Sequence, residues 1–528
     1  MSPIGDPPRD RGAIQGGNAD ARGAKRWTLV AAIIGSGMAF IDGTVVNVAL
    51  PAIQRQMDAT GADVQWVMES YALFLAALLL VGGALGDRFG RRRMFMLGIA
   101  VFTLASIGCA LSPGVGLLIG ARAVQGLGAA LLVPGSLALI SAAYPEGERG
   151  AAIGTWSAFS GITAALGPVL GGFLVEHYSW VWAFLINAPV GVALLVVCAL
   201  KVPESIGAAS RDPVDVRGAA WGTLGLGGIV FALIEAPARG WTSAPILSAA
   251  AIGCVALALF LHAEARERAP MVPLALFRER NFAAANLLTL LLYAALGGSL
   301  YFLPLNLIQV QGYGATAAGA AWLPLIAIMF LLSRWAGRLV DVFGPRPPLV
   351  VGPAIAAAGF ALFALPAVGT SYWTGFFPAI CVLGLGMTIT VAPLTTTVMN
   401  AVGADRAGIA SGINNAVSRT AGLLAIAVFG VVLAAAFDGR LAHGLAGLSL
   451  SHDVVDAVMA QHGKLAGIVL PEGLSAADAM AVKHAIGASF VAGFRQVMLI
   501  SAGMALASAL SAWVFMWPGA SIANGKRG

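Results

Sequence analysis

Three ionisable side chains interrupt long apolar stretches of the sequence: Asp42, Arg122 and Arg419. A charge in such a stretch is costly if the stretch lies in hydrocarbon, so each of the three is a candidate functional residue. Asp42 lies 8 residues before the end of its stretch at Leu50, a depth of about 12 Å along a helix. Arg122 lies about 7.5 Å inside its own stretch. The two side chains can therefore meet at a similar depth.

The chemistry that this aspartate and arginine could do together is reversible proton binding. A carboxylate beside a guanidinium stays ionised, and its affinity for a proton changes when the arginine moves away or is replaced by water or a ligand. Asp42 and Arg122 therefore predict a proton-coupling site. The alternative is a static ion pair that fixes helix packing. Glu69 and Glu235 fall at the ends of their apolar stretches, and we expect both at the membrane interface.

The segments that must position these residues are membrane-spanning helices. Of the 528 residues, 59% are hydrophobic and 11% are charged, whereas about 25% of the residues of a soluble protein are charged. The chain is therefore predicted to be an all-α integral membrane protein. Taking about 20 apolar residues as one span, we expect fourteen helices near residues 27–50, 66–86, 94–112, 117–140, 151–173, 180–200, 217–235, 246–263, 282–303, 316–339, 349–369, 374–399, 408–436 and 492–516.

The basic residues predict the orientation of these helices. With the N-terminus inside, 23 of the 31 lysines and arginines fall in cytoplasmic segments, as the positive-inside rule requires. Both termini are then cytosolic. Residues 1–26 are polar and lack an apolar stretch before a cleavage site, so we expect a disordered cytosolic tail and no secretory signal. Residues 517–528 are expected to form a second cytosolic tail.

An internal repeat predicts how the helices are grouped. Residues 83–92 (GALGDRFGRR) and 337–346 (GRLVDVFGPR) match at six of ten positions, and both fall on predicted cytoplasmic loops. Internal repeats are typical of transporters built from related halves. We expect an N-terminal six-helix bundle over 27–200, two inserted helices over 201–270 and a C-terminal six-helix bundle over 271–516. Residues 437–491 of the last bundle are expected to form an extracellular loop with some amphipathic helix.

Other kinds of chemistry have no support in the sequence. The four cysteines lie in apolar stretches without a pairing pattern, and four of the six histidines are scattered irregularly through 437–491, so no metal site is predicted. The basic residues lie in short loops, which indicates membrane topology and not nucleic-acid binding. There is no nucleotide-binding GxxxxGK[ST] loop and no nucleophile with a base. We therefore predict no catalytic residue and no cofactor, with the proton motive force as the energy source.

Two motifs carry a family resemblance. The stretch IDGTVVNVALP from Ile41 and the loop GALGDRFGRRR from Gly83 resemble those of the fourteen-spanner drug:proton antiporters (EmrB/QacA type) of the major facilitator superfamily. The resemblance implies a major facilitator fold with two six-helix bundles and two inserted central helices. It also implies that the loop locks the cytoplasmic face, through the gate residues Gly83, Asp87, Arg88, Gly90 and Arg91.

Two further helices extend the resemblance. IGARAVQGLGAA from Ile119 is similar to the family segment whose arginine, here Arg122, takes part in proton transfer. GTWSAFSGITAALGPVLGG from Gly154 resembles the antiporter motif, in which small residues allow tight packing and a proline bends the helix. Thr163 stands where that motif usually has glycine, and Val181 stands where the entry to the sixth helix usually has arginine. The antiporter-motif residues are Gly154, Gly167, Pro168, Gly171 and Gly172.

Polar side chains within the spans predict a substrate cavity near the bilayer midplane, between the halves. Each amide could instead bond a neighbouring helix. Because Asp42 is the single deep acid and is opposed by two arginines, we expect lipophilic substrates that are neutral, zwitterionic or monocationic, and not dications. The cavity candidates are Asn47, Asn187, Asn306, Gln309, Asn414, Asn415 and Arg419.

The function predicted from these residues and from the resemblance is efflux of lipophilic or amphipathic small molecules, as in multidrug or antibiotic resistance, by an antiporter in the bacterial inner membrane. Asp42 would take up a proton from outside as substrate leaves, and the halves would rock to release the proton inside. Small-molecule substrates, protons and membrane lipids are the expected partners, and nucleic acid is not. A periplasmic adaptor is left open, as are two other functions: a proton-coupled uptake symporter and a transport-inactive membrane sensor or scaffold.

Overall fold

The computed structural model describes residues 18–207, 215–267, 270–402 and 406–517 of the chain. These residues form helices and connecting turns without a β-strand, and 14 helical segments are long and apolar enough to cross a membrane. Each predicted apolar range overlaps one of these segments. The predicted all-α membrane fold with fourteen spans is therefore confirmed.

The first six spans pack together as one bundle. α4 lies against α2 and α3, while α1 lies against α5. The sixth span consists of the short helix α6 and, after a break at Ile186, the longer helix α7. The helices are α1 (Asn18–Met57), α2 (Gly61–Phe89), α3 (Arg91–Ala110), α4 (Val115–Ala143), α5 (Glu146–His177), α6 (Val181–Leu185) and α7 (Asn187–Lys201).

The last six spans form a second bundle, in which α13 packs against α14 and α17, and α10 packs against α15 and α17. α10 continues as a π-helical turn over Asn306–Val310, and a second π-helical turn, Tyr372–Phe376, precedes α14. The helices are α10 (Arg280–Leu305), α11 (Ala315–Ala320), α12 (Leu323–Phe343), α13 (Arg346–Phe363), α14 (Phe377–Asn400), α15 (Ala407–Ala446) and α17 (Ala476–Phe515).

Two helices lie between these bundles in the chain, α8 (Val216–Arg239) and α9 (Ala244–Arg266). They pack closely on each other, and α8 also contacts α2 of the first bundle and α15 of the second. The contact between α8 and α9 is tight because Gly225, Gly228 and Gly253 leave no room for a side chain where the two backbones meet. The inserted pair therefore covers one side of the junction between the halves.

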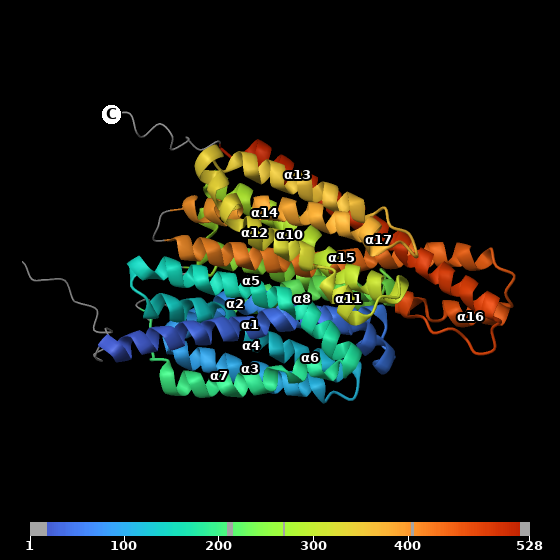
Figure 1. Cartoon of the computed structure of the whole chain (residues 1–528), viewed down its shortest axis with the longest axis horizontal. Coiled ribbons are helices and arrows are strands. Elements are labelled where there is room, and N and C mark those ends of the chain that lie inside the picture. Colours follow the sequence, from blue (N-terminus) through green and yellow to red (C-terminus); the bar gives the residue numbers. More distant parts are fainter. Residues whose placement is uncertain (1–17, 208–214, 268–269, 403–405, 518–528) are drawn as a thin grey trace, which may run out of the picture.

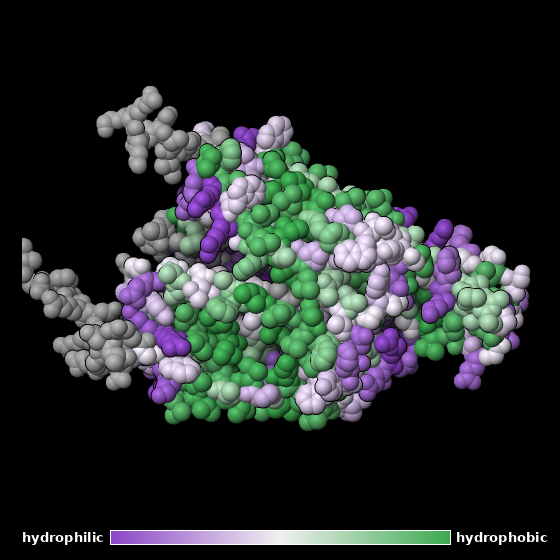
Figure 2. Space-filling view, in the orientation of Figure 1, coloured by the Kyte–Doolittle hydropathy of each residue, from purple (hydrophilic) through white to green (hydrophobic). Residues whose placement is uncertain are grey.

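The two ends of the molecule differ. α1 begins and α17 ends at one end, which we call the terminal face; at the opposite end, the loop face, α15 and α17 project beyond the other helices (Figure 1). Each of these two helices has 40 residues, or about 60 Å, twice the thickness of a hydrocarbon core of about 30 Å. Figure 2 shows a broad hydrophobic belt with hydrophilic residues gathered toward both ends, as expected of a protein surrounded by lipid.

Two segments are more helical than expected. α1 begins at Asn18, so the last part of the predicted tail 1–26 is helical, and Lys25 pairs with Glu148 of α5 at 2.7 Å; residues 1–17 and 518–528 lie outside the described residues. The predicted loop 437–491 is shorter, because α15 runs to Ala446 and α17 starts at Ala476. Between them lies the short amphipathic helix α16 (His452–Met459). We call residues 447–475 the outer loop.

Candidate functional site

Asp42 and Arg122 form a completely buried ion pair inside the first bundle. Arg122 Nη1 lies 2.5 Å from Asp42 Oδ2, and both side chains have no exposed area. The pair forms because α1 and α4 pack together with these two residues at the same depth. The structure thus brings together the two residues that were predicted to couple protons.

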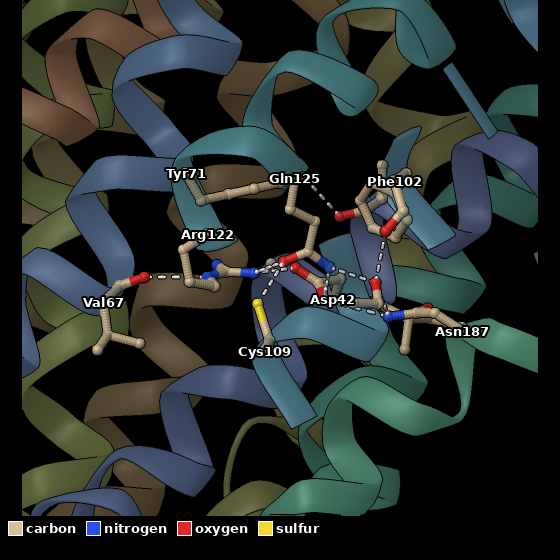
Figure 3. Close-up of polar contacts among 12 residues, drawn as sticks. Asp42, Val67, Tyr71, Phe102, Cys109, Arg122, Gln125 and Asn187 are labelled. Atoms are coloured by element: carbon tan, nitrogen blue, oxygen red, sulfur yellow. Dashed lines mark hydrogen bonds and ion pairs between the residues drawn. The ribbon is translucent and has the colours of Figure 1, made fainter. Parts of the chain in front are cut away.

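Three neutral polar residues complete the network around Asp42 (Figure 3). Gln125, one turn after Arg122 on α4, donates to Asp42 Oδ1 at 2.6 Å and accepts from Arg122 Nη1 at 2.7 Å. Asn187, at the start of α7, donates to the same Asp42 oxygen at 3.2 Å. Ser106 of α3 accepts a hydrogen bond of 2.8 Å from Gln125. Four helices of one bundle therefore converge on a single carboxylate.

Arg122 is held from three directions. Its Nε donates to the carbonyl oxygen of Val67 at 3.0 Å, and its guanidinium lies 4.3 Å from the ring centroid of Tyr71 and 5.7 Å from that of Phe184. A cation over aromatic faces in a dry site is stabilised by the ring quadrupoles. The remaining nitrogen, Nη2, has no hydrogen-bond partner within the described part of the chain. The arginine therefore keeps one donor free at the edge of the network.

This arrangement can act as a charge switch. Two buried opposite charges stabilise each other only as a pair, and removing one leaves the other uncompensated at a cost of about 3–5 kcal/mol. A proton on Asp42 cancels its charge and weakens three hydrogen bonds at once, those from Arg122, Gln125 and Asn187. Proton binding would therefore change how tightly α1, α4 and α7 are held together.

The predicted cavity residues do not form one cluster. Asn187 belongs to the Asp42 network, whereas Asn414 donates to Asn286 and Thr289 of α10 at 3.1 and 2.7 Å. Gln309 bonds Gln54 at the loop face. The others are scattered: Asn47 and Asn415 donate to carbonyls of their own helices, Asn306 accepts from Gln311, and Arg419 is half-buried on α15, near Tyr71.

The predicted gate residues form the turn between α2 and α3. Gly90 has a φ of 107°, which disfavours any other residue, and it ends α2 and starts α3. Arg91 donates to Asp87 Oδ1 at 2.8 Å, whereas Arg88 lies over the ring of its neighbour Phe89. Gly83 lies against Pro134 of α4. The ion pair of Asp87 with Arg91 is thus local to the turn.

Glu204, which was not predicted, anchors this turn to the segment after α7. Its two carboxylate oxygens accept from the backbone N–H groups of Arg92 and Arg93 at 3.0 and 3.2 Å, at the N-terminus of α3, where a negative charge is favoured by the helix dipole. Gly207 then donates its N–H to the carbonyl of Asp87 at 3.0 Å. The signal available in the sequence was an acid placed opposite a run of arginines.

The antiporter-motif glycines have different roles. Gly167 and Gly171 lie against Thr44 and Val45 of α1, while Gly172 lies against the backbone of Ala315 and Thr316 in the second bundle. Pro168 meets Gly319 of α11 there. Gly154 has open space around it. Part of the motif therefore packs α5 on α1, and part packs it on the other half of the molecule.

Polar contacts between the two bundles lie at the loop face. Gln54 of α1 accepts from Gln309 at 2.7 Å and donates to the carbonyl of Lys464 at 3.0 Å, and Lys464 pairs with Asp58 at 2.5 Å. Gln65 of α2 donates to the carbonyl of Ile426, and Glu176 accepts from the N–H of Thr316. Within the described ranges, no hydrogen bond or ion pair joins the bundles at the terminal face. The halves are therefore fastened together at the loop face.

Two cavities lie along the junction of the halves. One of about 200 Å³ opens toward the loop face between α2, α8, α10 and α15, and its lining includes Gln54, Gln65, Tyr301 and His462; we call it the outer cavity. The other, of about 540 Å³, lies nearer the terminal face between α2, α10, α15 and the inserted helices; we call it the inner cavity. Its lining is mostly apolar, with Phe260, Phe277 and Leu287 among its residues.

The position that the sequence predicted for Glu69 is wrong. Glu69 was expected at the membrane interface, but its side chain is completely buried. The span was expected to start at residue 66, whereas α2 starts at Gly61, where Thr60 and Asp63 form a capping box. The extra turn places Glu69 about 12 Å from the start of the helix. Glu235 does lie at a helix end, bonded to Trp66 and Arg239.

The fold and the buried charge network define a class: a polytopic membrane transporter made of two helical bundles, with an ionisable site inside one of them. The family model described as "Major Facilitator Superfamily" matches residues 32–426. The chain belongs to the Major Facilitator Superfamily. The resemblance recognised in its motifs is therefore confirmed.

Relatives of known name are similar over most of the chain. Multidrug resistance protein Stp of Mycobacterium tuberculosis is 38% identical over 419 residues, covering 78% of this chain and 77% of the relative. The tetracenomycin C resistance and export protein of Streptomyces glaucescens is 33% identical, covering 92% and 91%. The puromycin resistance protein of Streptomyces alboniger is 36% identical, covering 79% and 84%.

Solved structures share the fold at low sequence identity. A bacterial homolog of the human lysosomal transporter Spinster matches with a TM-score of 0.64 at 16% identity, covering 94% of this chain and 99% of that chain. A bacterial homologue of the human drug peptide transporters PepT1 and PepT2 matches with a TM-score of 0.56 at 15% identity, covering 93% and 97%. These likenesses support the fold alone.

Proposed function

We propose that the protein is a proton-coupled antiporter that exports lipophilic or amphipathic small molecules across a bacterial cytoplasmic membrane. The observation that carries the proposal is the completely buried Asp42–Arg122 pair with its ring of neutral donors, because it gives a single carboxylate a protonation-dependent set of partners. The names of the relatives, which include multidrug resistance, tetracenomycin C export and puromycin resistance, support export over uptake.

The predicted orientation in the membrane indicates which conformational state of the transport cycle this structure corresponds to. The basic residues predict that the terminal face is cytosolic, so the loop face is extracellular and the molecule is closed on the outside. The apolar inner cavity would then be the first binding place for a lipophilic substrate arriving from the cytosol or the inner leaflet. The inserted helices α8 and α9 form its wall toward the lipid.

The cycle follows from the switch at Asp42. In the inward-facing state the ionised Asp42 holds Arg122, Gln125 and Asn187. Substrate binding between the bundles favours rocking to the outward-facing state, in which the loop-face contacts break and Asp42 can take a proton from outside as substrate leaves. Protonated Asp42 no longer needs a buried counter-charge, so the return to the inward-facing state carries the proton across. Arg122 then displaces the proton toward the cytosol.

The test of this function is substrate-driven proton flux through the wild-type protein. We expect that, in liposomes with an imposed pH gradient, puromycin, tetracenomycin C or a lipophilic dye dissipates the gradient and moves in the opposite direction to the protons. A pH-sensitive fluorophore in the lumen reports the flux, and protein-free liposomes are the control. Movement of substrate and protons in the same direction would support an uptake symporter, and substrate movement without protons would contradict the coupling.

Because the halves are closed at the loop face, we predict that a larger side chain at Gly172 strongly lowers transport. A Cβ there would collide with the backbone of Ala315 and Thr316 on the opposite bundle, and overpacking of this kind costs about 1–3 kcal/mol. We expect Gly172→Val to hold the halves apart at the loop face and to lower the dye-efflux rate about tenfold in cells with equal amounts of protein. Gly154→Val, where a Cβ meets open space, is the matched control. Equal efflux by both variants would be evidence against this closure.

A further inference from the structure

Glu69 is a second buried acid at the junction of the halves. Its side chain has no exposed area, and neither carboxyl oxygen has a hydrogen-bond partner within the described residues. An unpaired carboxylate inside hydrocarbon is costly, by several kcal/mol. No lysine or arginine of the described segments lies within ion-pair distance of it. In this conformation the side chain must therefore be neutral, which requires a bound proton.

The position of Glu69 on α2 shows which way it faces. Gln65, one turn before it, lines the outer cavity and donates to the Ile426 carbonyl of α15. Leu73, one turn after it, packs against Val230 of α8 and Leu423 of α15. Because residues four apart lie on the same helix face, Glu69 faces the second bundle and α8, just below the floor of the outer cavity.

The surroundings of Glu69 suit an organic cation. Tyr301 of α10 lines the outer cavity and lies near Glu69. Aromatic rings beside a carboxylate are a favourable environment for a lipophilic monocation. The other titratable groups on the elements packed around α2 are already paired or lie elsewhere. Asp42 pairs with Arg122, Glu235 with Arg239, and at the outer cavity Asp438 pairs with His462 and Lys464 with Asp58. Arg419 of α15 lies near Tyr71.

We infer that Glu69 is a cation-recognition residue that exchanges its proton for a lipophilic monocationic substrate. The inference rests on the proposed antiport function and adds a binding site for cationic substrates, which Asp42 does not provide. Separation of α2 and α15 frees the carboxyl; the proton leaves to water, and the carboxylate takes the cationic group of the substrate as its counter-charge. Neutral substrates use the same cavity without Glu69 and depend on Asp42 for coupling.

The test is binding of tetraphenylphosphonium to the purified full-length protein in weak buffer, followed by tryptophan fluorescence and by the protons released. We expect the wild type to release protons on binding, and Glu69→Gln to bind at least tenfold more weakly and to release none. Glu69→Asp, which keeps the carboxyl, should retain most of the proton release. Glu235→Gln is the matched control, because Glu235 is on the facing helix α8 but is paired with Arg239.

The outcomes separate this inference from the proposed function. Equal tetraphenylphosphonium affinity and equal proton release in wild type and Glu69→Gln would overturn it, and so would the absence of tetraphenylphosphonium binding to the wild type. In liposomes, Glu69→Gln should still couple protons to the neutral antibiotic chloramphenicol, whereas failure of wild-type proton flux with neutral and cationic compounds alike would count against the antiporter itself.

Discussion

Replacing Asp42 by asparagine is expected to abolish substrate-driven proton flux, with a loss of at least 100-fold in liposomes. Asparagine fits the same space and can still bond Gln125 and Asn187, but it cannot take up or release a proton. It also leaves Arg122 as a buried charge without a counter-ion, which costs about 3–5 kcal/mol. Asp42→Asn should therefore unfold at a lower temperature in detergent as well as lose coupling.

The double variant Asp42→Asn/Arg122→Gln separates a proton switch from a static ion pair. Both charges are removed, so the buried arginine no longer lacks a partner and thermal stability should recover toward that of the wild type. If the pair only fixes helix packing, transport should recover with stability. If Asp42 carries the proton, stability recovers and proton flux does not. Asp438→Asn, near the loop-face end of α15 and beside His462 of the outer loop, is the control carboxylate and should leave coupling unchanged.

Arg122→Lys is expected to lower proton-coupled transport by about 10- to 100-fold although the positive charge is kept. Arg122 donates in separate directions, to Val67 on one side and to Asp42 and Gln125 on the other, while its flat guanidinium covers the ring of Tyr71. A lysine ammonium is a point charge without this planar fork, so it cannot make all of these contacts at once. The measurements are the initial rate of dye efflux and the initial rate of proton flux in the same liposomes.

Arg495→Lys is the matched control for this substitution, because Arg495 of α17 donates to the carbonyl of Ala364, has no ion pair among the described residues and should tolerate the change within about threefold. Transport by Arg122→Lys at the wild-type rate would show that charge alone is needed at this position. Recovery in the presence of small guanidinium compounds would instead support the geometric role of the lost fork.

The fold could be predicted from the sequence because a lipid bilayer strongly restricts the sequences that can cross it. Every span needs a long apolar run, and charges in such runs are so unfavourable that Asp42 and Arg122 stood out without any structure. That the two residues can pair was inferred from their similar depths along the two spans. The repeat around Asp87 and its counterpart Asp341 predicted two halves, and the first six and last six spans do pack as two bundles.

The rest of the site depended on information that depth does not contain. Gln125 and Ser106 are neutral polar residues in spans, where most such residues bond a neighbouring helix, so their role needed the rotation of α3 and α4 about their axes. The spacing of Gln125, three residues after Arg122, was the available signal. Glu69 was misplaced because the apolar run underestimates α2, whose first turn is polar and held by the Thr60 cap.

The contacts of the outer loop make the two halves unequal. The loop connects two helices of the second bundle, yet Lys464 contacts Asp58 and Gln54 of the first, so the loop works as a strap between the two bundles. Opening outward must break this strap, whereas the described residues at the terminal face hold no equivalent. Two hydrogen bonds of Gln54 at about 0.5–1.5 kcal/mol each favour the inward-facing state by a factor of about 5 to 150. The protein would then favour transport in one direction. Between turnovers it rests with its outer side closed, which limits back-leak of expelled compounds and of protons.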